Sequence, residues 1–305
     1  MGDRVWAAES GRGLSMRELR TVAVLGLGLL GGSVGLGAAR AFGRVRRVGY
    51  SHRAGTRRRA LEAGVVDEVR GTAAAAAGGA DLVILASPMG TFPELMAEIR
   101  PAVGARAVVT DVGSTKVLPV RWAGKYLRGA EYVGSHPMAG SEQRGLEFAR
   151  ADLFEGRACI VTPTGQNRRE AVRFVRRFWE ALGMRVQEMG AAEHDRVLAR
   201  ISHLPHVLAA ALVRSSALEE MLLCGKGFLD TTRIASGPVS VWRDILLANA
   251  GNTAGAIGRL TGELERMRRA LERGDEKTVV RLLEEARAKR GELVARKLAR
   301  HELPE

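Results

Sequence analysis

The stretch Val24-Leu25-Gly26-Leu27-Gly28-Leu29-Leu30-Gly31 decides the fold of this chain of 305 residues. It continues an apolar run, residues 21–25, and opens a glycine- and alanine-rich stretch that is predicted to be helical to about Phe42. Between a strand and a helix, the first glycine permits a tight turn, the second lets backbone N–H groups approach a pyrophosphate, and the third lets the helix pack closely on the strand. The sequence therefore predicts a dinucleotide site, whose contacts in this loop are Gly26, Gly28, Leu29, Leu30 and Gly31.

Short apolar runs alternate with helical stretches as far as about Gly190, which is typical of a parallel sheet covered by helices. Most runs are continuous in Val, Ile, Leu or Ala, as expected for strands that are covered on both faces. The predicted strands are residues 21–25, 47–50, 81–86, 107–111, 131–134, 158–162 and 184–188, with a helix at 168–182 before the last of them.

After about Gly190 the strand pattern ends, and helices are predicted at residues 191–220, 238–251, 252–273 and 275–301. Asp275 is expected to cap the last helix, because its carboxylate can accept a hydrogen bond from an N–H group of the first turn. The change of pattern predicts a Rossmann-type α/β dinucleotide-binding domain at 18–189 and an all-α domain for substrate binding and dimerisation at 190–305. Residues 1–17 are mixed polar and are expected to form an N-terminal extension.

The composition argues against several classes of protein. No apolar stretch approaches the roughly 20 residues of a membrane helix, and the first residues lack the apolar core of a secretory signal, so we expect a cytoplasmic protein without a membrane partner. The two cysteines, Cys159 and Cys224, lie far apart and are expected to be buried; their spacing fits neither a disulfide framework nor a metal site.

The chain carries a net charge of +13, which raises the question of a nucleic-acid partner. The arginines are spread along the chain, and aromatic residues make up only 5% of it, too few for base-stacking platforms. We therefore expect no nucleic-acid partner. A positive field of this kind also attracts an anionic cofactor and substrate.

The end of the second predicted strand bears on the choice of cofactor. A fold that selects NAD usually has Asp or Glu there, because the carboxylate accepts hydrogen bonds from the ribose and repels a 2′-phosphate. This chain has Ser51, His52 and Arg53 instead. A hydroxyl group beside a guanidinium suits a phosphate dianion, so NADP is favoured over NAD. Ser87 and Pro88, which follow the 81–86 strand, complete the predicted cofactor-binding set.

Two polar segments follow neighbouring predicted strands. Asp111-Val112-Gly113-Ser114-Thr115-Lys116 ends and follows the 107–111 strand, and Ser135-His136-Pro137-Met138-Ala139-Gly140 follows the 131–134 strand. Ligands of open α/β sheets lie beyond the carboxyl ends of the strands, so both segments are expected to face the nicotinamide end of the cleft. A histidine there can accept the proton of an alcohol while a hydride leaves its carbon, which makes His136 the candidate base.

The helical half contains Ser202-His203-Leu204-Pro205-His206, Asp230-Thr231-Thr232-Arg233-Ile234-Ala235 and Trp242-Arg243-Asp244-Ile245. With these motifs in this order, the sequence from about Thr21 to at least Leu247 resembles the prephenate and arogenate dehydrogenase family of tyrosine biosynthesis. The resemblance implies an NAD(P)-dependent oxidative decarboxylation, from prephenate to 4-hydroxyphenylpyruvate or from arogenate to tyrosine. It also implies a homodimer that pairs through its helical domains.

The resemblance assigns roles to particular residues. His136 resembles the residue that accepts a hydrogen bond from the ring hydroxyl of the substrate, and Ser114 the residue that positions that hydroxyl and His136. His206 is similar to a histidine near the nicotinamide and the substrate, so the implied catalytic set is His136, Ser114 and His206. Arg233 resembles a clamp for the side-chain carboxylate, a role that suits the bidentate guanidinium. The implied substrate-binding set is Arg233, Ser202 and His203.

Some features leave alternatives open. Many members of the family have a basic residue where this chain has Leu229, and Lys226 is the candidate replacement. His203 and His206 also suit a core position on an apolar helix, Trp242 is expected to pack, and His194 is expected to cap a helix or lie at the surface. Competing functions are a two-domain dehydrogenase of the β-hydroxyacid or pyrroline-carboxylate type and a catalytically inactive cofactor sensor. The residues do not distinguish prephenate from arogenate.

Overall fold

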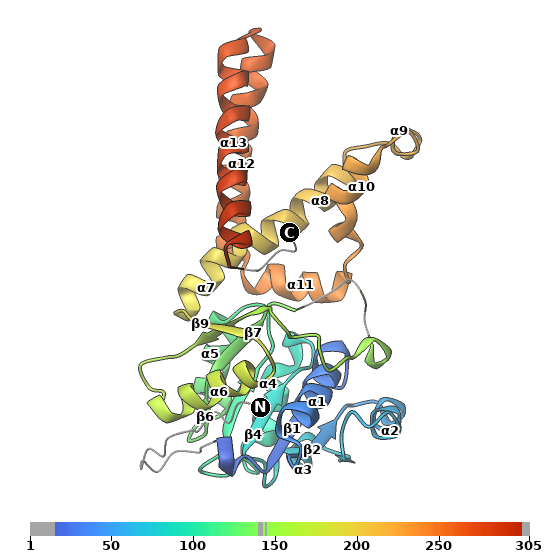
Figure 1. Ribbon diagram of the computed structural model, residues 1–305, viewed down its shortest axis with the longest axis vertical. Coiled ribbons are helices and arrows are strands. Elements are labelled where there is room, and N and C mark those ends of the chain that lie inside the picture. Colours follow the sequence, from blue (N-terminus) through green and yellow to red (C-terminus); the bar gives the residue numbers. More distant parts are fainter. Residues whose placement is uncertain (1–15, 140–142, 144, 301–305) are drawn as a thin grey trace. The chain divides into compact units, whose positions relative to one another are not determined.

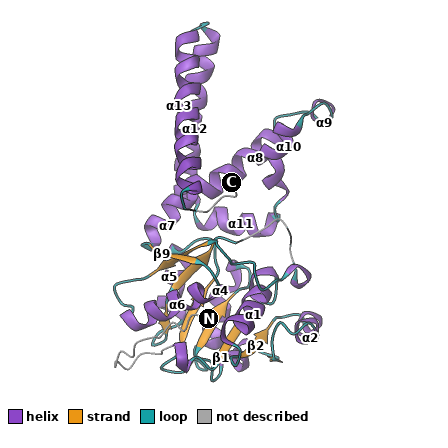
Figure 2. Ribbon diagram, viewed as in Figure 1, coloured by secondary structure: helices purple, strands orange, loops and turns teal. Residues whose placement is uncertain are grey.

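The computed structural model describes residues 16–139, 143 and 145–300. Most of the predicted extension, residues 1–17, therefore lies outside the described residues. The chain divides after Gly190 into two compact units. Strands are confined to the first unit and the second is helical in its described part, as Figure 1 and Figure 2 show.

A parallel sheet of six strands forms the centre of the first unit, in the order β3-β2-β1-β4-β5-β6. Four of the predicted strands lie in it almost as expected, and the two-residue β3 was missed because it is too short to give an apolar pattern. The order reverses between β1 and β4, so the carboxyl ends of these two strands mark the expected ligand crevice. The strands are β1 Thr21–Leu25, β2 Arg46–Tyr50, β3 Glu68–Val69, β4 Leu82–Leu85, β5 Val108–Asp111 and β6 Glu131–Tyr132.

The prediction of a single strand at residues 131–134 is wrong, because these residues belong to strands of two different sheets. β6 ends at Tyr132, and a separate strand, β7 Gly134–Pro137, pairs antiparallel with β8 Ala158–Thr162. β8 in turn pairs parallel with β9 Arg185–Glu188, so the strands predicted at 158–162 and 184–188 form a second sheet of three strands rather than extending the first. His136 consequently lies inside a strand and not after one.

Helices cover the strands of the first unit and complete its core. The mostly aliphatic core contains a group of aromatic rings: Trp179 makes edge contacts with Phe154 and Phe178, and Phe178 stacks on Phe42. This cluster ties the last helix of the unit to the first. The helices are α1 Leu29–Phe42, α2 Ala54–Glu62, α3 Ala73–Ala77, α4 Phe92–Ile99, α5 Val117–Tyr126 and α6 Arg169–Ala181, with short 3₁₀ turns η1 Met16–Glu18, η2 Met89–Thr91 and η3 Leu146–Phe148.

The second unit begins with a helix that is interrupted, although residues 191–220 were predicted to form one helix. α7 Ala191–Leu198 passes through a π-helical turn, η4 Ala199–His203, into α8 Leu204–Arg214, and α9 Leu218–Met221 is separate. Pro205 explains the wider turn, because it has no N–H to donate to the preceding turn of a regular α-helix. The interruption changes which side chains of the Ser202 to His206 motif share a face.

The helices predicted at 238–251, 252–273 and 275–301 are present to within a few residues, whereas the helical residues 226–236 were not predicted. Asp275 caps the last helix as expected, accepting a hydrogen bond from the backbone N–H of Thr278 at 3.0 Å. The last two helices pack against each other as a long hairpin. The elements are α10 Lys226–Thr232, η5 Arg233–Ser236, α11 Val239–Ala248, α12 Ala250–Glu272 and α13 Glu276–Leu298.

One helical stretch, Ala191–Arg214, is long and apolar enough to cross a membrane by those two criteria alone, contrary to the sequence-based expectation. Core helices of soluble proteins also meet these criteria. The stretch contains the π-helical turn and the buried, paired His194 and Asp195. We infer no membrane role from its length and composition.

Candidate active site

The loop between β1 and α1 has the geometry that a dinucleotide requires. Gly26 has a φ of +115°, and a Cβ atom there would lie 2.4 Å from the backbone of Ala86 and Ser87. A Cβ at Gly31 would lie 1.8 Å from the carbonyl oxygen of Gly26. A Cβ at Gly28, in contrast, would meet nothing within 4 Å. Gly26 and Gly31 therefore close the turn, and Gly28 leaves open space beside the backbone.

The amino end of α1 supplies donors to that space. Leu29 and Leu30 begin the helix, Gly28 precedes it without a side-chain cap, and no acidic residue lies in the first turn. The first N–H groups of a helix have no partner within it, and the helix dipole favours an anion there. These residues fit the pyrophosphate of a dinucleotide. On the neighbouring β4, Ser87 and Pro88 follow the strand, and the Ser87 hydroxyl lies 2.8 Å from that of Thr91.

The end of β2 presents a hydroxyl and guanidinium groups, with no carboxylate at the tip. Ser51 is buried, and its Oγ accepts a hydrogen bond from the backbone N–H of Arg53 at 3.4 Å. His52 and Arg53 are exposed. Arg57, which is outside the predicted set, donates from Nη1 to the Ser51 carbonyl oxygen at 2.5 Å. The sequence could have revealed this contact, because only the first turn of α2 separates Arg57 from the end of β2.

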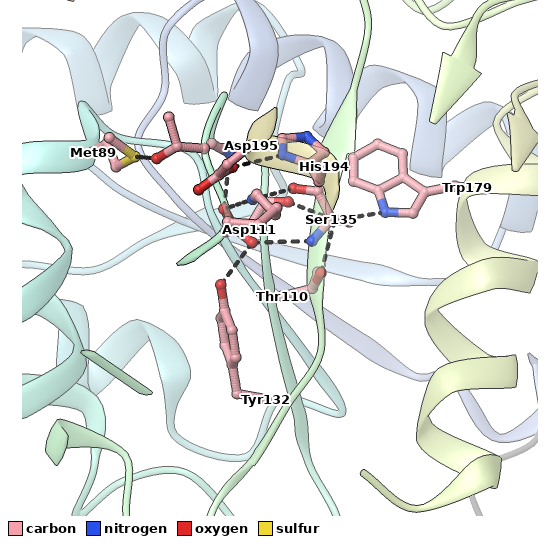
Figure 3. A network of polar contacts seen from close by, with 11 residues as sticks. Met89, Thr110, Asp111, Tyr132, Ser135, Trp179, His194 and Asp195 are labelled. Carbon is pink, nitrogen blue, oxygen red and sulfur yellow. Dashed lines mark hydrogen bonds and ion pairs between the residues drawn. The ribbon is translucent and has the colours of Figure 1, made fainter. Parts of the chain in front are cut away.

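A buried polar network lies at the carboxyl end of β5 (Figure 3). The carboxylate of Asp111 forms an ion pair with Lys116, and both side chains are fully buried. Asp111 Oδ1 also accepts hydrogen bonds from the Tyr132 hydroxyl at 2.9 Å and from the Ser135 N–H at 3.1 Å. Lys116 Nζ donates to the Ser135 carbonyl oxygen at 2.6 Å. Burial and the neighbouring carboxylate raise the pKa of Tyr132 well above its ordinary value, so the phenol remains a donor.

The predicted site lacks four residues of this network, although two of them are the first and last residues of the quoted 111–116 segment; the four are Asp111, Lys116, Tyr132 and Ser135. The feature of the sequence that could have revealed the ion pair is an acid and a lysine five residues apart after an apolar strand. Side chains of this kind are almost never fully buried unless they are paired. What the sequence does not disclose is that Ser135, on a different sheet, is their shared partner.

His136 and Ser114 flank this network. His136 lies in β7 opposite Ile160 of β8, and it is 7% exposed. Ser114 lies in the loop between β5 and α5 and is partly exposed. Cys159 lies opposite Pro137, and burial raises its pKa, so that the thiol stays protonated. Cys159 is buried as expected; the expectation was wrong for Cys224, which is partly exposed in the segment between α9 and α10.

In the second unit, His206 is fixed against an aromatic ring. The rings of His206 and Trp242 stack with centroids 3.6 Å apart and planes 12° from parallel. Burial lowers the pKa of His206, which keeps the imidazole neutral at physiological pH. Its Nδ1 has no hydrogen-bond partner among the residues that the structure describes. The packing expected of Trp242 is thus directed at the candidate histidine.

His203 is held inside the helical unit. The side-chain amide of Asn249 lies 3.2 Å from His203 Nδ1 and donates to the Asp195 carbonyl oxygen at 2.6 Å. Because an amide nitrogen only donates, Nδ1 accepts and the proton of the neutral ring lies on Nε2. Burial lowers the pKa of His203 to about 4. Ser202, its neighbour in the π-helical turn, is partly exposed.

The expectation that His194 caps a helix or lies at the surface was wrong. It is fully buried, and its Nδ1 lies 2.8 Å from Asp195 Oδ1. Two adjacent residues of a helix point in different directions, so a polar pair of this kind gives no periodic signal.

Arg233 begins η5 directly after α10 and is exposed. η5 packs against α8, the helix of His206. A Cβ added to Gly237, the residue after η5, would lie 3.1 Å from His206 Cε1. The structure therefore brings Ser202, His203, His206 and Arg233 to neighbouring elements of the helical unit. Leu229 and Lys226 are exposed on α10.

Comparison with known proteins now gives this arrangement a family. The description "Prephenate dehydrogenase, nucleotide-binding domain" matches residues 37–188, and "Prephenate dehydrogenase, dimerization domain" matches residues 190–285. The chain belongs to the prephenate dehydrogenase family. It is an NAD(P)-dependent oxidoreductase with a Rossmann-type domain and a helical domain. The first match begins after the glycine-rich loop, so the loop is identified by its geometry.

Individual relatives cover nearly the whole chain. Prephenate dehydrogenase of Bacillus subtilis is 32% identical over 275 residues, which are 88% of this chain and 74% of the relative. The crystal structure of prephenate dehydrogenase from Aquifex aeolicus in complex with hydroxyphenyl propionate and NAD⁺ is 33% identical, with a TM-score of 0.85 over 92% of this chain and 100% of that one. Synechocystis arogenate dehydrogenase is 25% identical, with a TM-score of 0.78 over 90% and 99%. The family excludes the competing reductase types.

Proposed function

We propose that this protein oxidises and decarboxylates prephenate, or its amino counterpart arogenate, with a nicotinamide dinucleotide as hydride acceptor. The observation that carries the proposal is the placement of His136. Its strand is bound through Ser135 to the carboxyl end of β5. In a parallel sheet this is the edge at which the open Gly28 loop also lies.

The chemistry requires a proton acceptor that later returns the proton. We assign to a ring nitrogen of His136 the hydrogen bond from the hydroxyl on the substrate ring. The O–H proton passes along this bond to His136 as the C–H bond at the same carbon breaks. A nicotinamide dinucleotide held at the open Gly28 loop would supply the hydride acceptor. The C–C bond to the ring carboxylate then breaks, its electron pair enters the ring, and carbon dioxide leaves. The product is a phenol, so His136 returns its proton and no net proton is released.

The other predicted residues have supporting roles in this proposal. Ser114, three residues after the end of β5, orients the ring hydroxyl and His136. Arg233 binds the carboxylate of the substrate side chain through its planar fork. Neutral His206, held by Trp242, offers a hydrogen-bonding group toward the substrate and the nicotinamide. Ser202 is its polar neighbour, and His203 supports it from the interior of the helical unit.

For the cofactor we propose NADP in preference to NAD. Ser51 stands where a carboxylate would repel a 2′-phosphate, and exposed Arg53 follows it. Arg57 fixes the carbonyl group of Ser51 and adds a second guanidinium near the strand end. A guanidinium supplies both charge and paired donors to a phosphate dianion.

We further propose a homodimer that acts in the cytoplasm, without a membrane or nucleic-acid partner. Among the described residues, the large apolar side chains that are exposed lie almost all in the second unit; Leu61 and Phe148 are the exceptions. Leu222 and Leu223 are 78% and 89% exposed. Large apolar side chains exposed in such number on one unit are typical of an interface between proteins. A dimer at low micromolar concentration in multi-angle light scattering is the expected result, and a monomer would contradict it.

Initial rates with each substrate test the function directly. Prephenate and arogenate are each supplied with NADP and with NAD, and the reduced dinucleotide and the aromatic product are both measured. The proposal expects equal amounts of the two products with at least one substrate. Absence of turnover with all four combinations, in a protein that binds the dinucleotide, would instead support the cofactor sensor.

A further inference from the structure

All polar groups of Ser135, the residue before His136, are held by side chains or backbone near the end of β5 or α6. Its N–H donates to Asp111 Oδ1 at 3.1 Å, and its carbonyl oxygen accepts from Lys116 Nζ at 2.6 Å. Its hydroxyl donates to the Asp111 carbonyl oxygen at 2.5 Å and accepts from the Trp179 indole N–H at 3.0 Å. Figure 3 shows these contacts converging on Ser135.

The backbone contacts of Ser135 take the place of a neighbouring strand along one edge of β7. β7 pairs with β8 along one edge, in the second sheet. In a continuous sheet the N–H and C=O groups of the other edge bond to a neighbouring strand, and buried backbone groups must find some partner. Here the Asp111 carboxylate takes the N–H and the Lys116 ammonium takes the C=O. The ion pair thereby fixes β7 in translation along its own axis, which a lone hydrogen bond does not.

The same pair closes the loop that carries Ser114. Asp111 ends β5, Lys116 immediately precedes α5, and Ser114 lies between them. The loop is tightened by the Gly113 N–H, which donates to Asp111 Oδ2 at 2.9 Å, and by the Thr115 hydroxyl, which lies 3.0 Å from Met89 Sδ. One buried contact therefore sets both the loop of Ser114 and the strand of His136.

We propose that the Asp111–Lys116 ion pair is a positioning device that holds Ser114 and His136 in register for the proton transfer. The inference rests on the roles proposed above for these two residues. Asp111 and Lys116 are positioning residues in this proposal: they act through Ser135 and the loop, and neither needs to touch the substrate. A misplacement of about 1 Å in a catalytic group can cost about 10²-fold in rate.

Both charged side chains of the ion pair can be replaced together by neutral side chains of similar volume. Removing one partner leaves an uncompensated buried charge and endangers folding, whereas replacing both with neutral residues of similar volume is often tolerated. The test variant is therefore the double substitution Asp111→Asn with Lys116→Met. Lys125→Met is the matched control, because Lys125 is an exposed lysine on α5.

The measurement is a cycle of kcat values in two backgrounds, the parent and His136→Asn, with the dinucleotide Kd measured in each. The neutral pair is expected to lower kcat about 10²-fold in the parent and at most about threefold in His136→Asn, since residues that act as a unit are not additive. The dinucleotide Kd should stay within about threefold in both. Lys125→Met should leave kcat unchanged.

Two results would overturn the inference: an unchanged kcat in the parent background, or the same fold loss in both backgrounds. The second would mean a general structural role or a direct contact with substrate. Failure of the proposals on which the inference rests is distinct: a wrong function would show as no turnover in the parent, and a wrong role for His136 as full turnover in His136→Asn. If the neutral pair does not fold, Tyr132→Phe decides, since it keeps the ring volume and removes the hydrogen bond to Asp111. It should give a smaller loss with the same dependence on background.

Discussion

His206 and Trp242 stack face to face, with ring centroids 3.6 Å apart. The stacking excludes water from one face of the imidazole, and burial lowers the pKa of His206. The pair therefore keeps a neutral histidine in a fixed orientation within the helical unit.

Trp242→Leu should raise the pKa of His206 toward its ordinary value, because the smaller side chain admits water to the ring. The test is an NMR titration of the His206 Cε1 proton, with Trp122→Leu on α5 as a matched control. An unchanged titration would show that other groups bury His206. We also expect a lower kcat/KM, since the orientation of the ring is lost.

His203 should make stability depend on pH in a defined direction. Its pKa is lowered from 6.5 to about 4 in the folded protein, so between these values the unfolded state binds more protons. The stabilisation is complete above the unfolded pKa and is lost as the pH falls toward the folded value, by at most about 1.4 kcal/mol per pH unit. Urea unfolding between pH 7.5 and 5 should therefore show a steeper loss for the parent than for His203→Gln. Parallel curves would contradict this.

Arg233→Ala should raise KM with little change in kcat, because a clamp on a remote carboxylate binds ground and transition states alike. The loss in kcat/KM should be roughly 2 to 4 kcal/mol once the substrate desolvates the pair. Arg266→Ala, an exposed arginine on α12 that pairs with Glu263, is the control. If the Arg233 variant matches the parent at saturating cofactor, the carboxylate is bound elsewhere.

The proposed preference for NADP depends on Ser51 and Arg53. Ser51→Asp should shift the preference toward NAD, since the carboxylate repels a 2′-phosphate and accepts hydrogen bonds from the ribose. Arg53→Ala should weaken NADP more than NAD, and Arg58→Ala, which removes an exposed arginine paired with Glu62 on α2, should change neither. The ratio of kcat/KM values decides. A parent that favours NAD tenfold, or equal losses for both cofactors in Arg53→Ala, would contradict the proposal.

The sequence predicts the parts of the fold that depend on local pattern. Continuous apolar runs revealed β1, β4 and β5, and the glycine spacing revealed the loop at Gly26 to Gly31. The break between β6 and β7 was missed because an apolar run does not show which strand it pairs with. In the second sheet, Ser135 of β7 is held by hydrogen bonds to Asp111 and Lys116, which lie 24 and 19 positions away in the sequence.

The helical unit shows the same limit. The motif of Ser202 to His206 was recognisable, yet the π-helical turn before Pro205 was not expected. The burial of His194 depends on its contact with Asp195, and two adjacent residues give no periodic signal. Patterns therefore indicated the elements and the candidate residues, and long-range polar contacts determined how the elements hold them.

The proposed chemistry is tested most directly by the turnover of His136→Asn with the preferred substrate and cofactor. The predicted result is a kcat lower by about 10² to 10⁴, the usual contribution of one general base, with the dinucleotide Kd unchanged. An unchanged kcat would contradict the role of His136 in the reaction.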